Sequence, residues 1–360
     1  MRAYNVASNV LTYNLTNTGL IYNLLCMTYN PKFTVTAHLV KIIEEIASCR
    51  EKIISSTVQV PWMPALQKDA RVRNTHGSTA IEGNPLTLEE VRILEEGKQL
   101  PSSTERSKKE ILNYFAALRF IEKNTSKKIV LEKDLLKLHG IISGNVMEQG
   151  KAGEFRKIVV RVGNYLPPKP EAVRSLTIEL LDWWNKLSSK WSPVISSAII
   201  HYRFEAIHPF GDGNGRTGRA LALWELYRRG FDSHHIFSVD EFFWEDRQGY
   251  YRALDNVGRQ NNDLTGWLEY VAEGIHLILE RVFLRIQKLS LNYGAEKIIL
   301  RPKQEKLLNL LRDRKSMSPK EIWGALNISK QGAMDLLNPL IEAGIIEKVG
   351  TKKSGKYILK

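Results

Sequence analysis

The sequence predicts a mainly α-helical protein with a short β-hairpin and a small α/β domain at its carboxyl end. Between residues 36 and 290 the apolar residues recur mostly at three- and four-residue spacings, the period of amphipathic helices. Residues 155–170 differ, because a β-branched run there ends in Gly and paired prolines, which is typical of a hairpin. Residues 345–359 alternate around a turn rich in Gly and Lys and predict a pair of strands.

The composition indicates a globular protein of two or three domains. The chain has 360 residues, of which 43% are hydrophobic and 25% charged, so it can bury cores of ordinary size. Its two cysteines, Cys26 and Cys49, provide neither a disulfide framework nor a metal-ligand cluster, and they fit a reducing, cytoplasmic compartment. Polar residues interrupt every apolar run well before the roughly 20 residues that cross a bilayer, so we expect no membrane partner.

Four segments are predicted along the chain. Residues 1–26 are poor in charge and rich in Asn, Thr, Leu and Tyr. We interpret them as an over-extended reading frame, with a disordered tail as the alternative. Residues 27–125 form an N-terminal helical region and residues 126–294 a helical core. Residues 295–360 form a separate domain, because the proline of "RP" at 301–302 should end the preceding helix.

Individual helices can also be predicted in order. Helical runs of apolar residues lie at 38–54, 108–124, 131–143, 194–208 and 216–229, with a long helix from about Leu264 to Ser290. Thr87 and Glu90 form the Thr-x-x-Glu pattern of a capping box, which marks one more helix start.

The stretch "HPFGDGNGR" at residues 208–216 has the chemistry of an anion site. Its glycines alternate with Asp212, Asn214 and Arg216 where the loop opens into a predicted helix. A glycine-rich loop at a helix N-terminus presents N–H groups and a positive dipole end to a phosphate. Arg216 and Arg219 would project from the first turn of that helix, and guanidinium groups suit phosphate oxygens. The pattern therefore predicts a phosphate-bearing ligand.

Two residues of the same loop supply a metal ligand and a base. Asp212 offers a hard oxygen of the kind that Mg²⁺ takes alongside phosphates. His208 lies close to a positive surface, which should lower its pKa and keep the imidazole neutral, as a general base must be. The loop has no Walker ending, and Leu223 stands where a calcium loop would need Glu. A glycine-rich helix cap is the alternative for any single residue, but the complete set favours a nucleotide site.

These residues resemble the Fic-family signature, His-x-Phe-x-Asp/Glu-Gly-Asn-Gly-Arg-x-x-Arg, with every fixed position filled between His208 and Arg219. Two further stretches strengthen the resemblance. Residues 155–173 resemble the β-hairpin flap that holds the target segment in this family. "STAIEGN" at 78–84 resembles the family's inhibitory motif when that motif lies N-terminal to the core. The resemblance covers about residues 60–290 and implies a Fic-type helical core.

The resemblance implies an enzyme, a protein adenylyltransferase that moves AMP from ATP to a Tyr, Ser or Thr hydroxyl of a target protein or of itself. His208 would deprotonate the attacking hydroxyl, Phe210 would anchor the loop, and Asp212 would bind Mg²⁺. The nucleotide would be held by Gly213, Asn214, Gly215, Arg216, Arg219, Tyr250 and Tyr251. For the two tyrosines, ordinary helix packing is the alternative.

The inhibitory motif implies a brake on this activity. Glu82 would occupy the guanidinium of Arg219, so that the γ-phosphate cannot bind there and ATP lies away from in-line geometry. The resemblance also allows Glu82 to orient a water that removes AMP. A solvated surface charge is the alternative for a lone Glu.

The C-terminal segment resembles a winged helix-turn-helix, a domain common at this end of long Fic proteins. Residues 301–360 hold 13 Lys and Arg against 6 Asp and Glu, which is +7 of the net charge of +13. Ser318 before Pro319 predicts the start of its second helix. The residues placed to contact DNA are Lys330, Gln331, Lys352, Lys353 and Lys356. The alternative is a winged helix that makes protein contacts, including a homodimer.

Three functional classes remain open at this point. The complete loop favours the adenylyltransferase, because a protein that only senses a nucleotide has no need of both His208 and Asp212. The second class is a DNA-binding transcriptional regulator whose Fic core senses nucleotide. The third keeps the enzyme but changes the donor to another nucleotide or a phosphocholine carrier.

Overall fold

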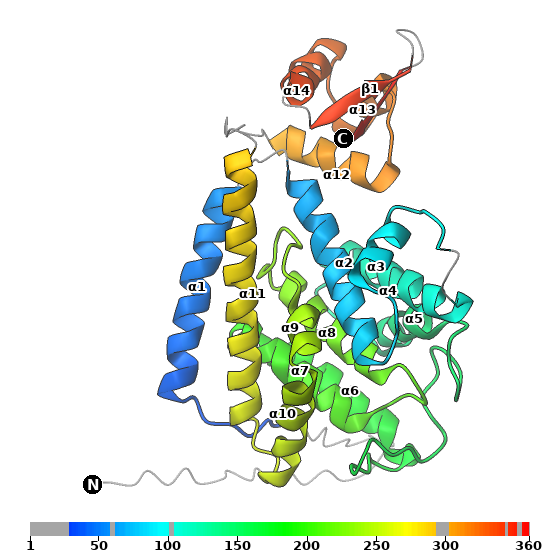
Figure 1. Ribbon diagram of the computed structural model, residues 1–360, viewed down its shortest axis with the longest axis vertical. Helices are drawn as coiled ribbons and strands as arrows, with labels where there is room; N and C mark the ends of the chain where they lie inside the picture. The colour runs from blue at the N-terminus through cyan, green and yellow to red at the C-terminus, as the bar shows by residue number, and fades with distance from the viewer. Residues whose placement is uncertain are drawn as a thin grey trace, which may run out of the picture.

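Helices dominate the computed structural model, which describes residues 29–57, 62–100, 104–292, 302–342, 345–350 and 355–359. They form a broad helical body and a small C-terminal unit that contains two strands (Figure 1). This confirms the predicted fold class, mainly α with a small α/β unit. Three predictions fall outside the described residues: the interpretation of residues 1–26, the domain boundary at residue 295, and the wing positions Lys352 and Lys353.

The helical body contains eleven α-helices among the described residues. They are α1 (Ala37–Thr57), α2 (Met63–Ile81), α3 (Leu88–Glu95), α4 (Glu105–Lys123), α5 (Glu132–Ser143), α6 (Pro170–Lys186), α7 (Pro193–Ile207), α8 (Asn214–Arg228), α9 (Val239–Glu245), α10 (Arg247–Arg259) and α11 (Thr265–Asn292). Each helix predicted from the spacing of apolar residues is present, with ends that differ by a few residues.

Local signals explain where some helices begin. The Thr87 hydroxyl accepts a hydrogen bond from the Glu90 amide, and the Glu90 carboxylate accepts one from the Thr87 amide. This is the predicted capping box, and it starts α3. Ser318 and Glu321 form the same arrangement at the start of α13 (Pro319–Leu326). These contacts span three residues, so the sequence is sufficient to predict them.

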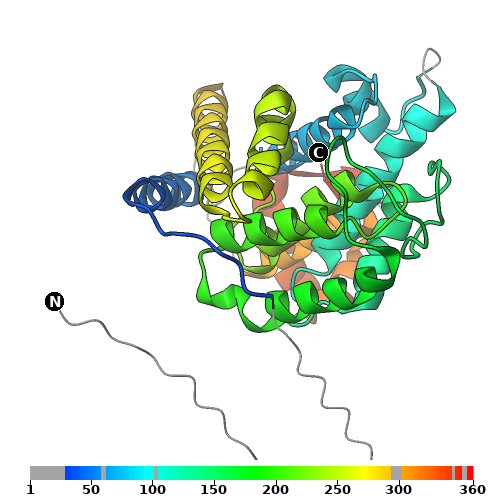
Figure 2. The same ribbon diagram turned by 90° about the horizontal axis from the view of Figure 1, so that it is seen from below.

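The core of the body surrounds α7. This helix packs against α8, α6 and α11, and it is apolar on nearly every side. In Figure 2 the green helices of this region cross the centre of the body, next to α11 in yellow. A helix that is hydrophobic all round belongs in a protein interior. As a result, the loop that follows α7 is held by a rigid support.

Helices α1 and α11 run side by side in the same direction along one edge of the body (Figure 1). The segments before the two helices are joined by a hydrogen bond from the Leu264 amide to the Lys32 carbonyl at 2.8 Å, and within the helices His38 lies 2.9 Å from Glu273. Cys49 of α1 is a buried free thiol. No helix among the described residues is long and apolar enough to cross a membrane.

The predicted hairpin at 155–170 is smaller than expected. Only Val162 and Tyr165 pair, with reciprocal N–H to carbonyl distances of 3.0 and 2.9 Å. The rest of the segment is irregular, because Pro167 and Pro168 have no N–H to extend a ladder. Arg156 also binds the Ile158 carbonyl, at 2.9 Å. We call residues 155–169 the flap.

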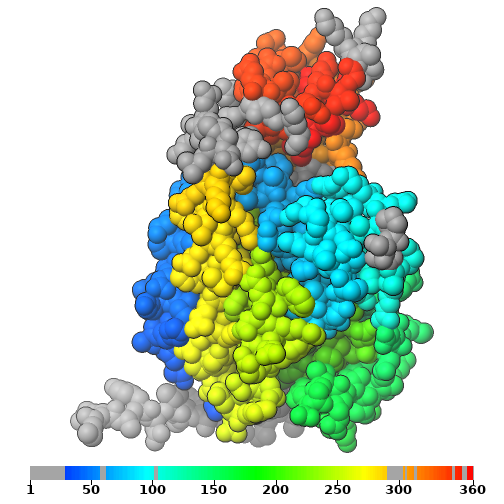
Figure 3. Space-filling model, viewed as in Figure 1, coloured from blue at the N-terminus to red at the C-terminus, as the bar shows by residue number. Residues whose placement is uncertain are grey.

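The C-terminal unit comprises α12 (Pro302–Arg314), α13, α14 (Lys330–Glu342), β1 (Ile346–Val349) and β2 (Lys356–Leu359). The two strands pair antiparallel, with Ile346 opposite Leu359. The unit has its own apolar core and stands beyond the body in Figure 3, in orange and red. The predicted boundary at residue 295 falls between α11 and α12, outside the described residues.

Candidate active site

The loop between α7 and α8 has a tightly constrained backbone. His208 ends α7 in the left-handed conformation (φ 50°), and its amide donates to the Phe204 carbonyl at 2.9 Å. Gly213 is also left-handed (φ 77°), and a Cβ there would lie 2.2 Å from Ser143 Oγ. A Cβ on Gly211 would lie 2.7 Å from the Gln149 carbonyl oxygen. These glycines are therefore required by close backbone approach and by a positive φ.

The buried side chain of Asn214 closes this loop. Its Oδ1 accepts from the Phe210 amide and its Nδ2 donates to the Phe210 carbonyl, each at 2.9 Å. Both polar atoms of the side chain are thus engaged within the loop, and the backbone N–H is the group of Asn214 left to contact a phosphate. The predicted contact of this residue with the nucleotide stays a prediction.

His139 of α5 supports the loop from beneath, and sequence reasoning missed it. Its ring stacks on Phe210 with centroids 3.6 Å apart and planes almost parallel. The Gly153 amide donates to His139 Nδ1 at 2.9 Å, so the proton is on Nε2, which donates to the Asp212 carbonyl at 2.9 Å. Burial lowers the pKa of His139 to about 4 and keeps it neutral. A single His on an amphipathic helix carries no signal of such a role.

His208 has the protonation state of a base at neutral pH. Burial, more than any charge, lowers its pKa to about 4, with a smaller effect of Arg156 in the same direction. We expected a lowered pKa from the positive surface of the loop. The direction is correct, but desolvation is the main cause and the contributing cation belongs to the flap.

A mostly buried carboxyl faces His208, and no sequence pattern indicates it. Glu205, one helical turn earlier on α7, places Oε2 3.7 Å from His208 Nδ1. Burial raises the pKa of Glu205 to about 8, with the charge of Arg219 opposing this shift and the charge of Glu82 adding to it. At neutral pH this carboxyl is mostly protonated. It closes off Nδ1, so Nε2 is the ring nitrogen left for a ligand.

The predicted partners Glu82 and Arg219 are brought together by the fold. Glu82 follows the last residue of α2, and its Oε1 lies 2.7 Å from Arg219 Nη2. The fully buried guanidinium also donates to Ser78, through Nε to Oγ at 2.9 Å and through Nη2 to the carbonyl at 2.8 Å. A Cβ added to Gly215 would lie 2.2 Å from Glu82 Oε1. The Glu82 carboxylate thus lies against the first turn of α8, where a helix favours an anion.

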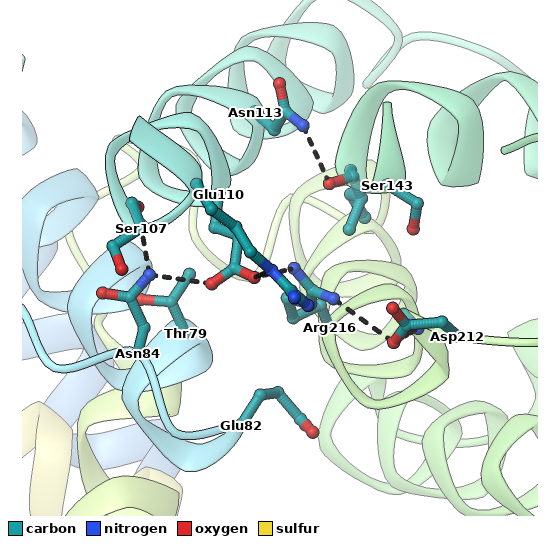
Figure 4. A network of polar contacts seen from close by, with 12 residues as sticks. Thr79, Glu82, Asn84, Ser107, Glu110, Asn113, Ser143, Asp212 and Arg216 are labelled. Carbon is teal, nitrogen blue, oxygen red and sulfur yellow. Dashed lines mark hydrogen bonds and ion pairs between the residues drawn. The ribbon is translucent and has the colours of Figure 1, made fainter. Parts of the chain in front are cut away.

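Arg216 is buried but its donors are largely free. Its Nη2 lies 3.5 Å from Asp212 Oδ1 and its Nη1 lies 3.9 Å from Glu110 Oε1 (Figure 4). Within the described part of the chain, Nε and Nη1 have no hydrogen-bond partner. Buried donors without partners are costly, so this guanidinium is suited to receive an anion.

The residues present fit a magnesium ion that comes with a nucleotide. Among the described residues no group of three or more His, Cys, Asp or Glu side chains could hold a metal. Asp212 instead offers one carboxylate, which accepts from the Gly213 amide at 2.6 Å. Mg²⁺ is commonly bound through one or two carboxylates together with substrate phosphates and water. Asp212 alone is therefore a sufficient donor set only if a phosphate is present.

The two predicted tyrosines differ in their environment. Tyr250 is 1% exposed, packs among His201, Phe243 and Trp267, and places its hydroxyl 3.0 Å from His201 Nε2. The Tyr250 hydroxyl also accepts a hydrogen bond from Arg219 Nη1 at 3.4 Å, so its predicted place on the nucleotide side stays a prediction beside the alternative of helix packing. Tyr251 is 42% exposed and remains a candidate nucleotide contact.

Arg156 joins the flap to the loop between α7 and α8. It is buried, its amide donates to the Pro209 carbonyl at 2.9 Å, and its Nε donates to the His208 carbonyl at 2.7 Å. Five large hydrophobic side chains of the flap are exposed, namely Ile158, Val159, Val162, Tyr165 and Leu166. An apolar surface therefore lies on the segment that contacts His208.

Comparisons with known proteins agree with this geometry. Residues 129–226 match the family model described as the Fic/DOC family. The protein adenylyltransferase fic-1 of Caenorhabditis briggsae is 36% identical over 211 residues, which cover 57% of this chain and 39% of that protein. Its counterpart from Caenorhabditis elegans is 35% identical over 231 residues, 61% of this chain and 43% of that protein. The chain thus spans less than half the length of these curated relatives.

A solved structure extends the likeness to most of the chain. A Fic family protein from Desulfovibrio desulfuricans G20 superimposes with a TM-score of 0.62 at 25% identity. The match covers 92% of this chain and 98% of that one. The matched family region contains the loop from His208 to Arg219, with its helices α7 and α8. Residues 129–226 therefore form a domain of the Fic/DOC family.

Proposed function

We propose that this protein is an adenylyltransferase that transfers AMP from ATP to a Tyr, Ser or Thr hydroxyl of a target protein or of itself. One observation carries the proposal: a neutral, mostly buried histidine and two buried arginines border one loop at the N-terminus of α8. The relatives that match this region are named protein adenylyltransferases. In such transfers the protein chiefly positions the reactants and stabilises charge.

His208 would act as the general base. Because Nδ1 is buried against Glu205, Nε2 would accept the proton of the attacking hydroxyl. The hydroxyl oxygen would bond to the α-phosphorus while the bond from that phosphorus to the pyrophosphate oxygen breaks. Pyrophosphate is the leaving group, so atoms and charge balance without any redox partner.

The phosphates would lie across the first turn of α8. The N–H groups of Gly213 and Gly215 would hold the inner phosphates, while Arg216 and Arg219 would hold the outer ones. Asp212 would hold Mg²⁺, which when bound neutralises phosphate charge. Tyr251 would lie on the nucleotide side.

Glu82 would keep this site silent in the resting protein. Its carboxylate lies on Arg219 and against Gly215, so it takes the place of an outer phosphate. ATP would then bind with its α-phosphate turned away from in-line attack. The same carboxylate would be suited to orient a water that removes AMP.

The flap would hold the target. Extended target segments can add main-chain hydrogen bonds to an exposed edge, while pockets or apolar surfaces select side chains. The exposed Val159 and Leu166 lie on the segment that Arg156 joins to His208. The acceptor hydroxyl would reach the base from this side.

The test of the function is transfer of an α-labelled nucleotide. The protein is incubated with Mg²⁺ and α-labelled ATP, GTP, CTP or UTP, alone and with lysate. A parallel reaction uses a labelled phosphocholine carrier. Label on protein from ATP alone is the expected result. Label from another donor would identify that compound as the donor. If the Glu82→Gly protein acquired no label from any donor, the proposed enzymatic function would be refuted.

A second function, DNA binding by the C-terminal unit, is favoured by the exposure of Lys330 and Gln331 in the first turn of α14. The full chain should retard duplex DNA, and a chain that ends at residue 294 should not. Affinity should fall steeply as salt rises, because phosphate contacts release counterions. Gel-shift titrations at several salt concentrations measure this. Equal retardation by both chains would show that the unit is not the DNA-binding part, and no retardation at low salt would favour protein contacts such as a homodimer.

A further inference from the structure

A carboxylate outside the family's loop faces the phosphate site. Glu110 lies on α4, and its Oε1 is 3.9 Å from Nη1 of Arg216 (Figure 4). Glu110 is mostly buried, and its other charged neighbour is Arg106, whose Nε lies 3.5 Å from Oε1. Arg106 is half exposed and also binds Glu148 at 2.6 Å. The buried side of Glu110 is therefore directed to Arg216.

The other oxygen of Glu110 is held by the turn that carries Glu82. Asn84 Nδ2 donates to Glu110 Oε2 at 2.8 Å and to the Ser107 carbonyl at 3.0 Å. Asn84 Oδ1 accepts from the Leu86 amide at 3.1 Å, which fixes the amide orientation. This buried Asn, two residues after Glu82, thus determines how Glu110 points. The contacts form a continuous path from the inhibitory turn to Arg216 (Figure 4).

Arg216 lies between two carboxylates, and neither one binds it closely. The distances of 3.9 Å to Glu110 and 3.5 Å to Asp212 balance the buried positive charge, yet Nε and Nη1 remain without hydrogen-bond partners in the described structure. A phosphate ligand needs this state: a fixed, charged guanidinium with free donors. If one carboxylate lost its charge, nothing would oppose the attraction of the other, and Arg216 would move toward it.

We propose that Glu110 is a positioning residue of the phosphate site, which keeps Arg216 apart from Asp212 and links it through Asn84 to the inhibitory turn. The inference rests on the proposed function, since Arg216 is there the phosphate ligand and Asp212 the metal ligand. Without the charge of Glu110, Arg216 would close onto Asp212. One ion pair would then occupy both groups.

Glu110→Gln separates this role from a purely structural one. The glutamine oxygen can still accept from Asn84 Nδ2, so the shape and the hydrogen bond are kept while the charge is lost. In a Glu82→Gly background, where the site is open, binding of ATP with Mg²⁺ should weaken about tenfold, the effect of one lost charge-assisted contact. The Mg²⁺ concentration for half-maximal ATP binding should rise. AMP binding should not change, because AMP has no outer phosphates for Arg216.

Calorimetric titrations with ATP and with AMP measure these effects. Glu105→Gln is the matched control, since Glu105 also lies on α4 but is exposed and pairs with Lys108 at 2.8 Å. It should leave both affinities unchanged. Glu110→Asp keeps the charge and should bind ATP with an affinity between those of the parent and Glu110→Gln. This second variant also covers the case in which Glu110→Gln does not fold.

A double-mutant cycle identifies the route of the effect. If Glu110 acts through Arg216, Glu110→Gln should cause no further loss of ATP affinity in an Arg216→Ala protein. An equal loss in both backgrounds, or unchanged ATP affinity in the first, would overturn the inference. These binding results are independent of AMP transfer. A Glu82→Gly protein that shows the predicted binding but labels nothing would refute the proposed function and leave the role of Glu110 standing.

Discussion

Glu82→Gly should raise AMP transfer by orders of magnitude, including transfer of AMP to the protein itself. The variant removes the carboxylate that lies 2.7 Å from Arg219 and against Gly215. Both groups then become available to the outer phosphates. Effective alignment of reactants accounts for roughly 7–11 kcal/mol in well-oriented systems, so recovering part of it gives about a hundredfold or more. Initial rates of protein labelling from α-labelled ATP measure the change.

Arg219 supplies the complementary variant. Arg219→Ala also breaks the contact with Glu82, but it removes a phosphate ligand as well, so we expect it to lower transfer. Glu89→Gln, an exposed carboxylate on the nearby helix α3, should leave the rate unchanged. Equal labelling rates for the parent and Glu82→Gly would contradict the inhibition and favour the alternative, in which Glu82 is an ordinary surface charge.

His208→Ala should reduce transfer by about 10²- to 10⁴-fold, the usual contribution of a positioned general base, and remove detectable labelling. ATP affinity and the thermal unfolding midpoint should change little. The His208 side chain makes no hydrogen bond through Nδ1, and the loop is anchored here by the carbonyl that accepts from Arg156. Labelling assays in the Glu82→Gly background measure the transfer rate, and calorimetric titration measures the ATP affinity.

His208→Asn is the matched control for backbone strain, because His208 is left-handed and Asn tolerates that conformation better than Ala. Both variants should lose transfer equally. Since the pKa of His208 is lowered to about 4, the base should stay in its active form between pH 6 and 8. Undiminished labelling by either variant would remove His208 from the mechanism. A loss of rate with an apparent pKa near 6.5 would instead show that burial does not control its protonation.

The order of the helices and the glycine-rich loop before α8 could be predicted from the sequence because their signals are local. Helical periodicity and the capping box of Thr87 and Glu90 depend on residues three or four apart. The loop motif depends on glycines and charges in one short stretch, and its likeness to a known family identified both the loop and the inhibitory motif. The hairpin was overestimated for the same reason: β-branched residues favour a strand locally, but the prolines and the contacts of Arg156 decide the pairing.

Tertiary structure alone decided which groups support that loop. The contact between Glu82 and Arg219 joins residues 137 positions apart. The resemblance to a family implied this pair, but only the structure gives its distance and its burial. His139, Glu205 and Glu110 lie on amphipathic or buried helices where a single polar residue carries no local signal. Their roles arise because packing brings α4, α5 and α7 against one end of α8 and excludes water there. That exclusion lowers the pKa of His208, protonates Glu205 and leaves Arg216 with free donors, and these effects depend on burial, which is a property of the assembled fold.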